Sequence, residues 1–294
     1  MSVAVENYAS DIMLCDTSEH ASVIYDKASR LPRTSTRLAL KQKNGIQIDG
    51  SFPANSSKAS FCYAFLNGCP LVLKLYDNQL NANREKEVAK RIGNQEACTE
   101  NNLVFLFSIE VLTENSPLEA LTARLHSGSL RPSPFFALAS PVYVMTLDKW
   151  PSPMYPRDLS KMGRQMLIAL TKLHSLKICH NDIKPDNIFI DQNGNFFLGD
   201  FGACETMGAV IQEFTRDFMP ECITHCSKFS DYALLKATIL KQSGITIPST
   251  STVEEYDTQC RTLMMKLGED CAALLSSALF LMDPIEGKYF YSYY

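Results

Sequence analysis

Four polar side chains in one short stretch have the types and spacing that phosphate chemistry requires. Asp182 offers a carboxylate that can accept the proton of a hydroxyl. Lys184, two residues later, would project to the same side of an extended backbone and could contact a phosphate. Asn187 and Asp200 offer a neutral and a charged oxygen, which suits Mg²⁺ because this ion takes a few such oxygens together with phosphate and water. Gly202 allows the chain to turn directly after the second ligand.

The surrounding sequence predicts the elements that would hold this stretch in place. Before it, apolar residues recur at helical spacing over 159–173. Within it, residues 188–191 predict a strand, and Asn-Gly at 193–194 predicts a hairpin turn. After position 221 the apolar pattern is helical again. We therefore expect the second half of the chain to be mostly helical.

The first half of the chain predicts strands and one helix. Residues 61–66 and 71–76 predict two strands, and Asn-Gly at 67–68 between them is a frequent hairpin turn. Residues 80–93 predict a helix that stops at Gly93. Further strands are expected at 103–111 and 142–145.

Strands with one helix, followed by mostly helices, indicate an α+β arrangement of two lobes. We expect an N-terminal extension over residues 1–40, an N-lobe over 41–147 and a C-lobe over 148–294. The length and the 46% hydrophobic content suit one large globular unit or two tightly joined lobes.

The chemical stretch also resembles a known family. Residues 180–187 read HNDIKPDN and residues 199–202 read GDFG, which resembles the HRDLKPEN catalytic loop and DFG metal-binding segment of eukaryotic-type protein kinases. Further similarities are the LH, FMPE, SDY and LMDP segments at 173–174, 218–221, 230–232 and 281–284. The resemblance covers roughly residues 45–290. It implies a two-lobe protein-kinase-like fold with a small β-rich N-lobe, one key helix and a mostly helical C-lobe.

The resemblance implies a role for each polar residue of the stretch. Asp182 would be the catalytic base, and Lys184 would contact the γ-phosphate of ATP. Asn187 and Asp200 would bind Mg²⁺, with Mn²⁺ as an alternative. This arrangement would transfer the γ-phosphate to a hydroxyl of a protein substrate.

A lysine–glutamate pair in the N-lobe is also implied. Lys74 sits on an apolar strand, where a solvated charge is unexpected, and matches the family's lysine that binds the α- and β-phosphates and pairs with a helix glutamate. Glu85 and Glu87 are the two possible partners. The positions three, four and seven residues after Glu85 are apolar, whereas those after Glu87 are polar, so helix periodicity favours Glu85.

The phosphate loop departs from the family pattern. Residues 50–60 contain no GxGxxG; the loop begins with Gly50 and Ser51 and is rich in serine. Glycines let backbone N–H groups approach phosphates closely, and a serine-rich loop donates from backbone and hydroxyl groups at longer range. We expect Gly50 and Ser51 to contact the nucleotide and the affinity for ATP to be reduced.

The adenine site is predicted from the resemblance alone. Val72 and Phe189 would line the adenine, and both are bulkier than the family's usual residues. The strand at 142–145 would lead to the hinge between lobes, with Met145 as the gatekeeper. The main chain of Thr146 and Asp148 would then hydrogen-bond adenine.

The residue before the predicted base is also unusual. Asn181 stands where the family's HRD motif has an arginine that meets a phosphate on the activation segment. Its presence predicts an enzyme that needs no activation-loop phosphorylation. The neighbouring His180 would be a structural residue that packs under Phe201.

Three functions are consistent with these residues. The favoured one is an active, divergent Ser/Thr protein kinase, because Lys184 two residues after the base is the Ser/Thr-type arrangement. The second is a pseudokinase that serves as an interaction module, motivated by the missing glycine loop and the bulky Val72. The third is a small-molecule kinase of the choline or aminoglycoside type, because those families share an HND-type loop.

Composition limits the partners and the compartment. The net charge of −4 gives no global support for nucleic-acid binding. The ten cysteines show no paired zinc-ligand spacing, and no apolar run approaches the length of a membrane span. We expect reduced thiols, a cytoplasmic or nuclear location, a protein substrate and a regulatory protein partner.

Overall fold

A computed structural model describes residues 46–49, 59–66, 69–76, 79–109, 136–218, 223–248 and 252–267. The predictions for residues 1–40, for Gly50 and Ser51, and for the segments 219–221 and 281–284 lie outside the described residues. The chain divides into two compact units, each described separately below. One takes the chain up to Ala97 together with Phe105–Val142; the other takes Cys98–Val104 and the chain from Tyr143. The division falls before the predicted boundary at 147.

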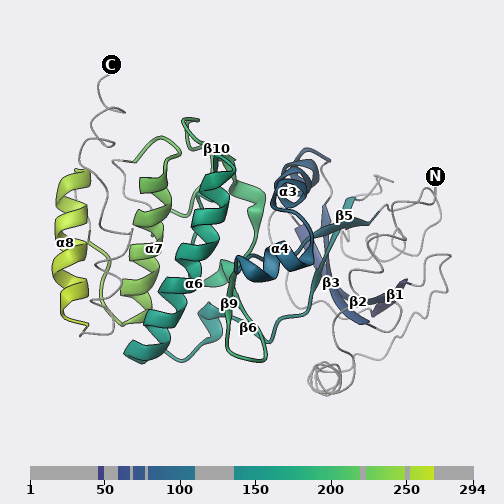
Figure 1. Ribbon diagram of the computed structural model, residues 1–294, viewed down its shortest axis with the longest axis horizontal. Helices are drawn as coiled ribbons and strands as arrows, with labels where there is room; N and C mark the ends of the chain where they lie inside the picture. Colours follow the sequence, from purple (N-terminus) through teal and green to yellow (C-terminus); the bar gives the residue numbers. More distant parts are fainter. Residues whose placement is uncertain are drawn as a thin grey trace, which may run out of the picture. The chain divides into compact units, whose positions relative to one another are not determined.

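The first unit contains a five-stranded antiparallel sheet in the order β1-β2-β3-β5-β4 (Figure 1). The strands are β1 Ile46–Asp49, β2 Ala59–Leu66, β3 Cys69–Tyr76, β4 Phe107–Ile109 and β5 Phe136–Pro141. Leu66 pairs with Cys69, so the predicted β2–β3 hairpin is confirmed. On β3, the leucines at 71, 73 and 75 are buried, as expected for a strand with one face on a core.

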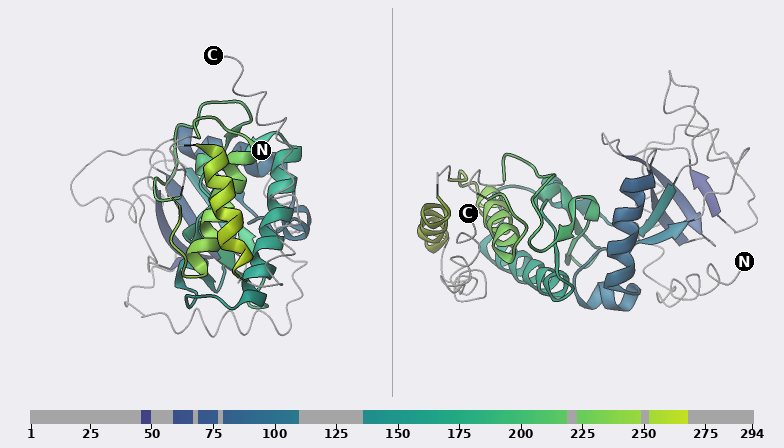
Figure 2. Two further views of the ribbon diagram at one scale, coloured as in Figure 1. Left: turned by 90° about the vertical axis from the view of Figure 1, so that its left-hand side faces the viewer. Right: turned by 90° about the horizontal axis from the view of Figure 1, so that it is seen from above.

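The long helix α3 Gln79–Ile92 in the described part of this unit packs against β3, β4 and β5 (Figure 2). Its buried residues Ala82, Val88 and Ile92 share one face with Glu85. The helix ends as predicted at Gly93, whose φ of 118° is a conformation that glycine adopts without strain.

The strand predicted over 142–145 is wrong. β5 ends at Pro141, and Met145 and Thr146 form β6, which pairs with β8 in the second unit. Tyr143 lies between these strands and its ring packs against Phe189 and Phe197, with centroids 5.5 and 5.4 Å away. The apolar run at 142–145 therefore reflects packing in the second unit and not a continuous strand.

Of the strand predicted over 103–111, the described residues 103–109 form a strand only at β4. The segment before β4 belongs to the second unit. There, the Val104 N–H donates to the carbonyl oxygen of Leu198 at 2.9 Å, and the Leu198 N–H donates to that of Asn102 at 2.8 Å. The helix before this segment, α4 Gln95–Glu100, buries Cys98.

Three long helices dominate the described part of the second unit: α6 Pro156–Ser175, α7 Lys228–Gln242 and α8 Val253–Met265. α7 lies between the other two and contacts both (Figure 1). α6 buries the apolar face predicted for it. The short strands are β6 Met145–Thr146, β7 Ile178–Cys179, β8 Ile188–Ile190, β9 Phe196–Leu198 and β10 Glu205–Thr206. β6, β8 and β9 form one small sheet, and β7 pairs with β10.

The structure confirms the α+β fold with a β-rich first unit and a mostly helical second unit. In the described part of the chain, no helix combines the length and apolarity needed to cross a bilayer.

A buried ion pair joins α7 to α8. Lys236 is fully buried and its ammonium group contacts Asp257, which also accepts a hydrogen bond from Arg261 Nε at 2.7 Å. Burial alone would raise the pKa of the Asp257 carboxyl, but the charge and hydrogen bonds of Lys236 and Arg261 outweigh it and lower the pKa below its ordinary value. Asp257 therefore stabilises the fold at neutral pH.

We predict that Asp257→Ala lowers the free energy of unfolding by about 3–5 kcal/mol, because it removes the carboxylate that pairs with the buried Lys236 ammonium group. Urea denaturation measures the loss. Glu254→Ala, at an exposed position on the same helix, is the control and should change little. The stabilisation from Asp257 is present above its unfolded-state pKa of about 3.9 and is lost as pH falls through the lower folded-state value. A loss under 1 kcal/mol at pH 7 would contradict the assignment.

Candidate functional site

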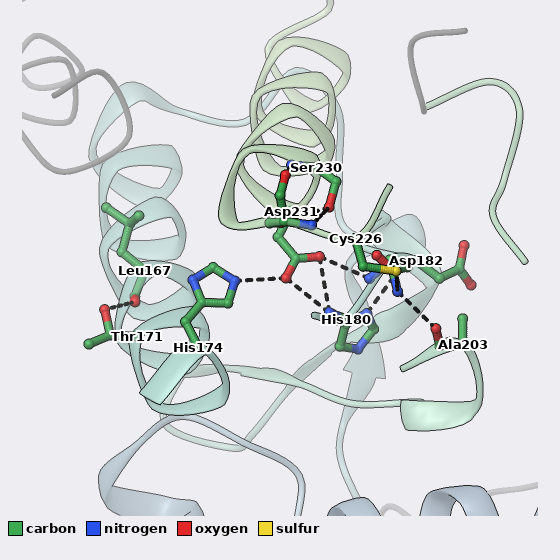
Figure 3. Close-up of polar contacts among 11 residues, drawn as sticks. Leu167, Thr171, His174, His180, Asp182, Ala203, Cys226, Ser230 and Asp231 are labelled. Carbon is green, nitrogen blue, oxygen red and sulfur yellow. Dashed lines mark hydrogen bonds and ion pairs between the residues drawn. The ribbon is translucent and has the colours of Figure 1, made fainter. Parts of the chain in front are cut away.

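A buried carboxylate fixes the start of the predicted catalytic loop. Asp231, in the first turn of α7, accepts hydrogen bonds from the backbone N–H of His180 at 2.9 Å and of Asn181 at 2.9 Å (Figure 3). The His174 Nε2 lies 2.8 Å from the same carboxylate. Asp231 is fully buried, and these donors satisfy the charge that burial would otherwise destabilise. Asp231 therefore fixes the backbone of the loop at His180 and Asn181.

The imidazole of His180 joins the loop to the segment before Asp200. Its Nδ1 accepts a hydrogen bond from the Asp182 N–H at 3.3 Å, so Nε2 carries the hydrogen and donates to the Gly199 carbonyl oxygen at 3.0 Å. The ring meets that of Phe201 edge-on, with centroids 5.9 Å apart. This contact agrees with the structural role predicted for His180.

The carboxylate of Asp182 is the centre of a second network. Its Oδ2 accepts from Lys184 Nζ at 2.8 Å and from Asn187 Nδ2 at 2.9 Å. Its Oδ1 accepts from the hydroxyl of Thr215 at 2.6 Å, and that hydroxyl accepts from Lys184 Nζ at 2.8 Å. The three predicted residues of the loop are therefore in direct contact. Thr215 is an addition that sequence reasoning missed; its position shortly before the FMPE segment was the available signal.

The two predicted metal ligands lie at one end of the β8–β9 hairpin. Asn187 directly precedes β8, and Asp200 follows β9 by two residues. The Gly199 N–H donates to the Asn187 carbonyl oxygen at 2.9 Å, which holds the two backbones side by side. The side-chain nitrogen of Asn187 points to Asp182, and no hydrogen bond among the described residues occupies its Oδ1. Asn187 thus has an oxygen left for a cation.

Close packing explains the glycine before Asp200. A Cβ at Gly199 would lie 2.7 Å from Val104 Cγ2 and 2.9 Å from Phe189 Cε2, both too short for real contacts. Asp200 itself has a φ of 59°, a left-handed conformation that Asp and Asn tolerate better than most residues. The backbone around this predicted metal ligand is therefore constrained at Gly199 by packing and at Asp200 by its left-handed conformation.

The first unit holds the predicted ion pair. Lys74 Nζ lies 2.6 Å from Glu85 Oε1, and the other carboxylate oxygen contacts the Tyr76 hydroxyl. Glu85 is fully buried, whereas Glu87 is exposed, so the helix phase inferred from the sequence is correct. The Lys74 ammonium also lies 5.3 Å from the centre of the Tyr76 ring, within range of a cation–π interaction.

The predicted adenine contacts are only partly supported by this geometry. Val72, on β3, and Phe189, on β8, are each half-buried in their own units. Met145 lies on β6 and not on a strand of the first unit's sheet, and Thr146 pairs with Phe189. The adenine contacts of the Thr146 and Asp148 main chain stay predictions.

The carboxylate of Asp148 has local partners instead. It accepts hydrogen bonds from the Thr146 hydroxyl and from Lys149. Burial alone would raise the pKa of this carboxyl, but the two hydrogen bonds and the Lys149 charge lower it below its ordinary value. The hydrogen bonds of Asp148 are thus local and stabilise the turn formed by residues 146–149.

A second group of side chains that could bind a metal ion lies next to the start of the predicted catalytic loop. One ligand atom each from His174, Cys179 and Asp231 lie within 4.8 Å of one another, and all three residues are buried. The Asp231 oxygens already accept hydrogen bonds, and burial strongly raises the pKa of the Cys179 thiol, which keeps it protonated. This cluster therefore supports the catalytic loop and differs from the Asn187–Asp200 pair.

The sequence that contains Asp182, Asn187 and Asp200 is similar to sequences of known proteins. The family model for the protein kinase domain matches residues 139–232. Over these residues the chain is similar to eukaryotic-type protein kinases.

Three similar proteins illustrate the extent of the likeness. They are "Serine/threonine-protein kinase MRCK alpha" of Homo sapiens (46% identical over 50 residues), "Serine/threonine-protein kinase Genghis Khan" of Drosophila melanogaster (40% over 50) and "Serine/threonine-protein kinase US3" of Human herpesvirus 2 (46% over 57). The aligned residues make up 17%, 17% and 19% of this chain. They span 3%, 3% and 12% of the three relatives' own lengths.

We predict that Gly199→Ala destabilises the protein by about 1–3 kcal/mol, because the added methyl group overpacks the contact with Val104 and Phe189. Thermal or urea unfolding measures the change. Val104→Ala in the same chain removes the nearest clashing atoms, so the double variant should lose less stability than the sum of the single variants. Strict additivity of the two losses would show that the clash is not the cause.

Proposed function

We propose that this chain is a Ser/Thr protein kinase that transfers the γ-phosphate of ATP to a protein hydroxyl with the help of Mg²⁺. The observation that carries the proposal is the Asp182 network, in which one carboxylate already accepts a hydrogen bond from the aliphatic hydroxyl of Thr215. A substrate serine or threonine presents the same chemical group. Lys184 and Asn187 hold the carboxylate from its other oxygen, so it stays oriented.

The chain's own residues would divide the work as follows. Asp182 would orient the acceptor hydroxyl and take its proton while the oxygen forms a bond to the γ-phosphorus and the bond to ADP breaks. Lys184 would offer positive charge to the phosphate, and Lys74, held by Glu85, would do so for the α- and β-phosphates. Asn187 and Asp200 fit a hard cation, because they offer one neutral and one charged oxygen. Such an ion would neutralise phosphate charge when bound.

The proposal includes activity without activation-loop phosphorylation, since Asn181 is neutral and uses its side chain inside the fold. A protein substrate, a regulatory partner and a cytoplasmic or nuclear location remain predictions from the sequence. Adenine would be bound by main-chain groups of Thr146 and Asp148, as the resemblance implies.

Binding of Mg-ATP separates this proposal from a pseudokinase. A ligand at 100 times its dissociation constant stabilises a protein by about 2.7 kcal/mol, which a thermal-shift assay detects. We expect a clear shift with millimolar Mg-ATP and phosphate transfer to a generic protein substrate. Absence of both would favour an interaction module. Labelling of choline or an aminoglycoside, with none of protein, would favour a small-molecule kinase.

We predict that Asp200→Asn lowers metal-dependent transfer by about 100-fold or more, because the variant keeps the shape and the left-handed backbone but loses the charged ligand. A radiolabelled transfer assay over a range of Mg²⁺ concentrations measures the effect. Asp186→Asn, at an exposed position on the same loop, is the control. Equal rates for wild type and Asp200→Asn would refute the metal assignment.

We predict that Thr215→Val lowers kcat by about 10- to 100-fold, because a hydrogen bond to a charged group contributes about 1.5–3 kcal/mol. Thr215→Ser keeps the hydroxyl and should retain most of the activity. Steady-state kinetics against a protein substrate make the comparison. The exposed Thr206 is a suitable control for a threonine-to-valine change elsewhere in the segment. If Thr215→Ser is as impaired as Thr215→Val, the hydroxyl is not the group that matters.

A further inference from the structure

The segment after Asp200 folds back on itself. The Ile211 N–H donates to the Thr224 carbonyl oxygen at 2.9 Å. The N–H groups of Cys226 and Gly208 donate to the carbonyl oxygens of Ala209 and Cys226, each at 2.8 Å. We call residues 203–211 the outgoing arm and residues 223–226 the returning arm. These backbone bonds join the two arms in an antiparallel ladder, and Thr215 lies in the stretch that connects them.

One side chain of the catalytic loop ties both arms to the loop. Asn181 Nδ2 donates to the Ala203 carbonyl oxygen at 3.2 Å and to the Cys226 sulfur at 3.3 Å. Ala203 begins the outgoing arm and Cys226 ends the returning arm. Figure 3 shows Cys226 and Ala203 converging beside the catalytic loop, next to the Asp231 network. The side-chain amide of Asn181 therefore links one residue of each arm to the catalytic loop.

The environment of Asn181 suits a short neutral side chain. The residue is fully buried, and its φ of 63° is a left-handed conformation that asparagine adopts more readily than most residues. Burial raises the pKa of the Cys226 thiol to about 11, so its partner is also neutral at physiological pH. The amide of Asn181 meets two neutral acceptors here, the Ala203 carbonyl oxygen and the Cys226 sulfur.

We propose that Asn181 is a positioning residue that holds the activation segment through these neutral contacts, with Cys226 as its partner on the returning arm. The proposal deepens the proposed kinase function and rests on it. Because Thr215 lies between the arms, the two contacts of Asn181 also help to keep the Thr215 hydroxyl within hydrogen-bonding distance of Asp182. An ordered segment then requires no phosphate group.

Matched variants separate the effect of the Asn181 side-chain amide from the effect of its left-handed backbone conformation. Asn181→Gly keeps the left-handed conformation at no steric cost but removes the donor. Cys226→Ala removes the acceptor, and Cys226→Ser retains one. We expect kcat to fall about tenfold in Asn181→Gly and in Cys226→Ala, with KM for Mg-ATP unchanged. Cys226→Ser should recover most of the lost rate.

Hydrogen exchange supplies a readout that does not depend on activity. The amides of Gly208, Ile211 and Cys226 should exchange faster in Asn181→Gly than in wild type, while amides of α6 and α7 keep their protection. Enzyme treated with a phosphatase should keep its kcat. Unchanged exchange and unchanged kcat in Asn181→Gly would overturn the proposal, as would loss of activity after phosphatase treatment.

The two proposals fail in different ways. If the wild-type protein binds Mg-ATP but transfers no phosphate, the proposed kinase function is wrong. The exchange experiment then still decides whether Asn181 holds the segment. If the wild type is active and Asn181→Gly is equally active with faster exchange at all amides, Asn181 serves general stability only, and its positioning role is refuted.

Discussion

The second unit depends on the burial of one carboxylate. An ionised carboxylate without partners is strongly disfavoured in a protein interior, so Asp231 is tolerable only where donors surround it. The backbone N–H groups of His180 and Asn181 supply them. A capping box between Ser227 and Ser230 fixes the start of α7 and thereby places Asp231 in its first turn, where the helix dipole also favours negative charge. The first turn of α7 thus positions the catalytic loop through Asp231.

Further polar contacts orient Asp182, the predicted catalytic base, which follows the residues bound by Asp231. The anchored loop presents Asp182, whose two oxygens are divided between Thr215 on one side and Lys184 with Asn187 on the other. Lys184 and Asn187 come from the loop itself, whereas Thr215 lies 33 residues further along the chain. The orientation of the carboxylate is therefore overdetermined, which is the condition for preorganised catalysis.

Sequence reasoning was successful where local patterns carried the information. The β2–β3 hairpin, the α3 helix and the choice of Glu85 over Glu87 all followed from periodicity and turn chemistry. It failed at 142–145, because an apolar run looks the same whether it forms a strand or fills a gap between aromatic rings, as Tyr143 does. It also could not foresee why position 199 is a glycine, since the clash involves Val104, which is distant in the sequence.

The short segment Cys98–Val104 has a consequence for dividing the chain. It lies between α3 and β4 in the sequence, yet it belongs to the unit that begins again at Tyr143. Asn102, Leu103 and Val104 cover the outer edge of β9, through backbone bonds to Leu198 and a side-chain bond from Asn102 to the Phe196 carbonyl oxygen. A fragment cut at Tyr143 would expose that strand edge and the apolar surface beneath Leu103. The second unit is therefore a discontinuous domain, and its expression as a separate piece would require this segment to be supplied or its edge redesigned.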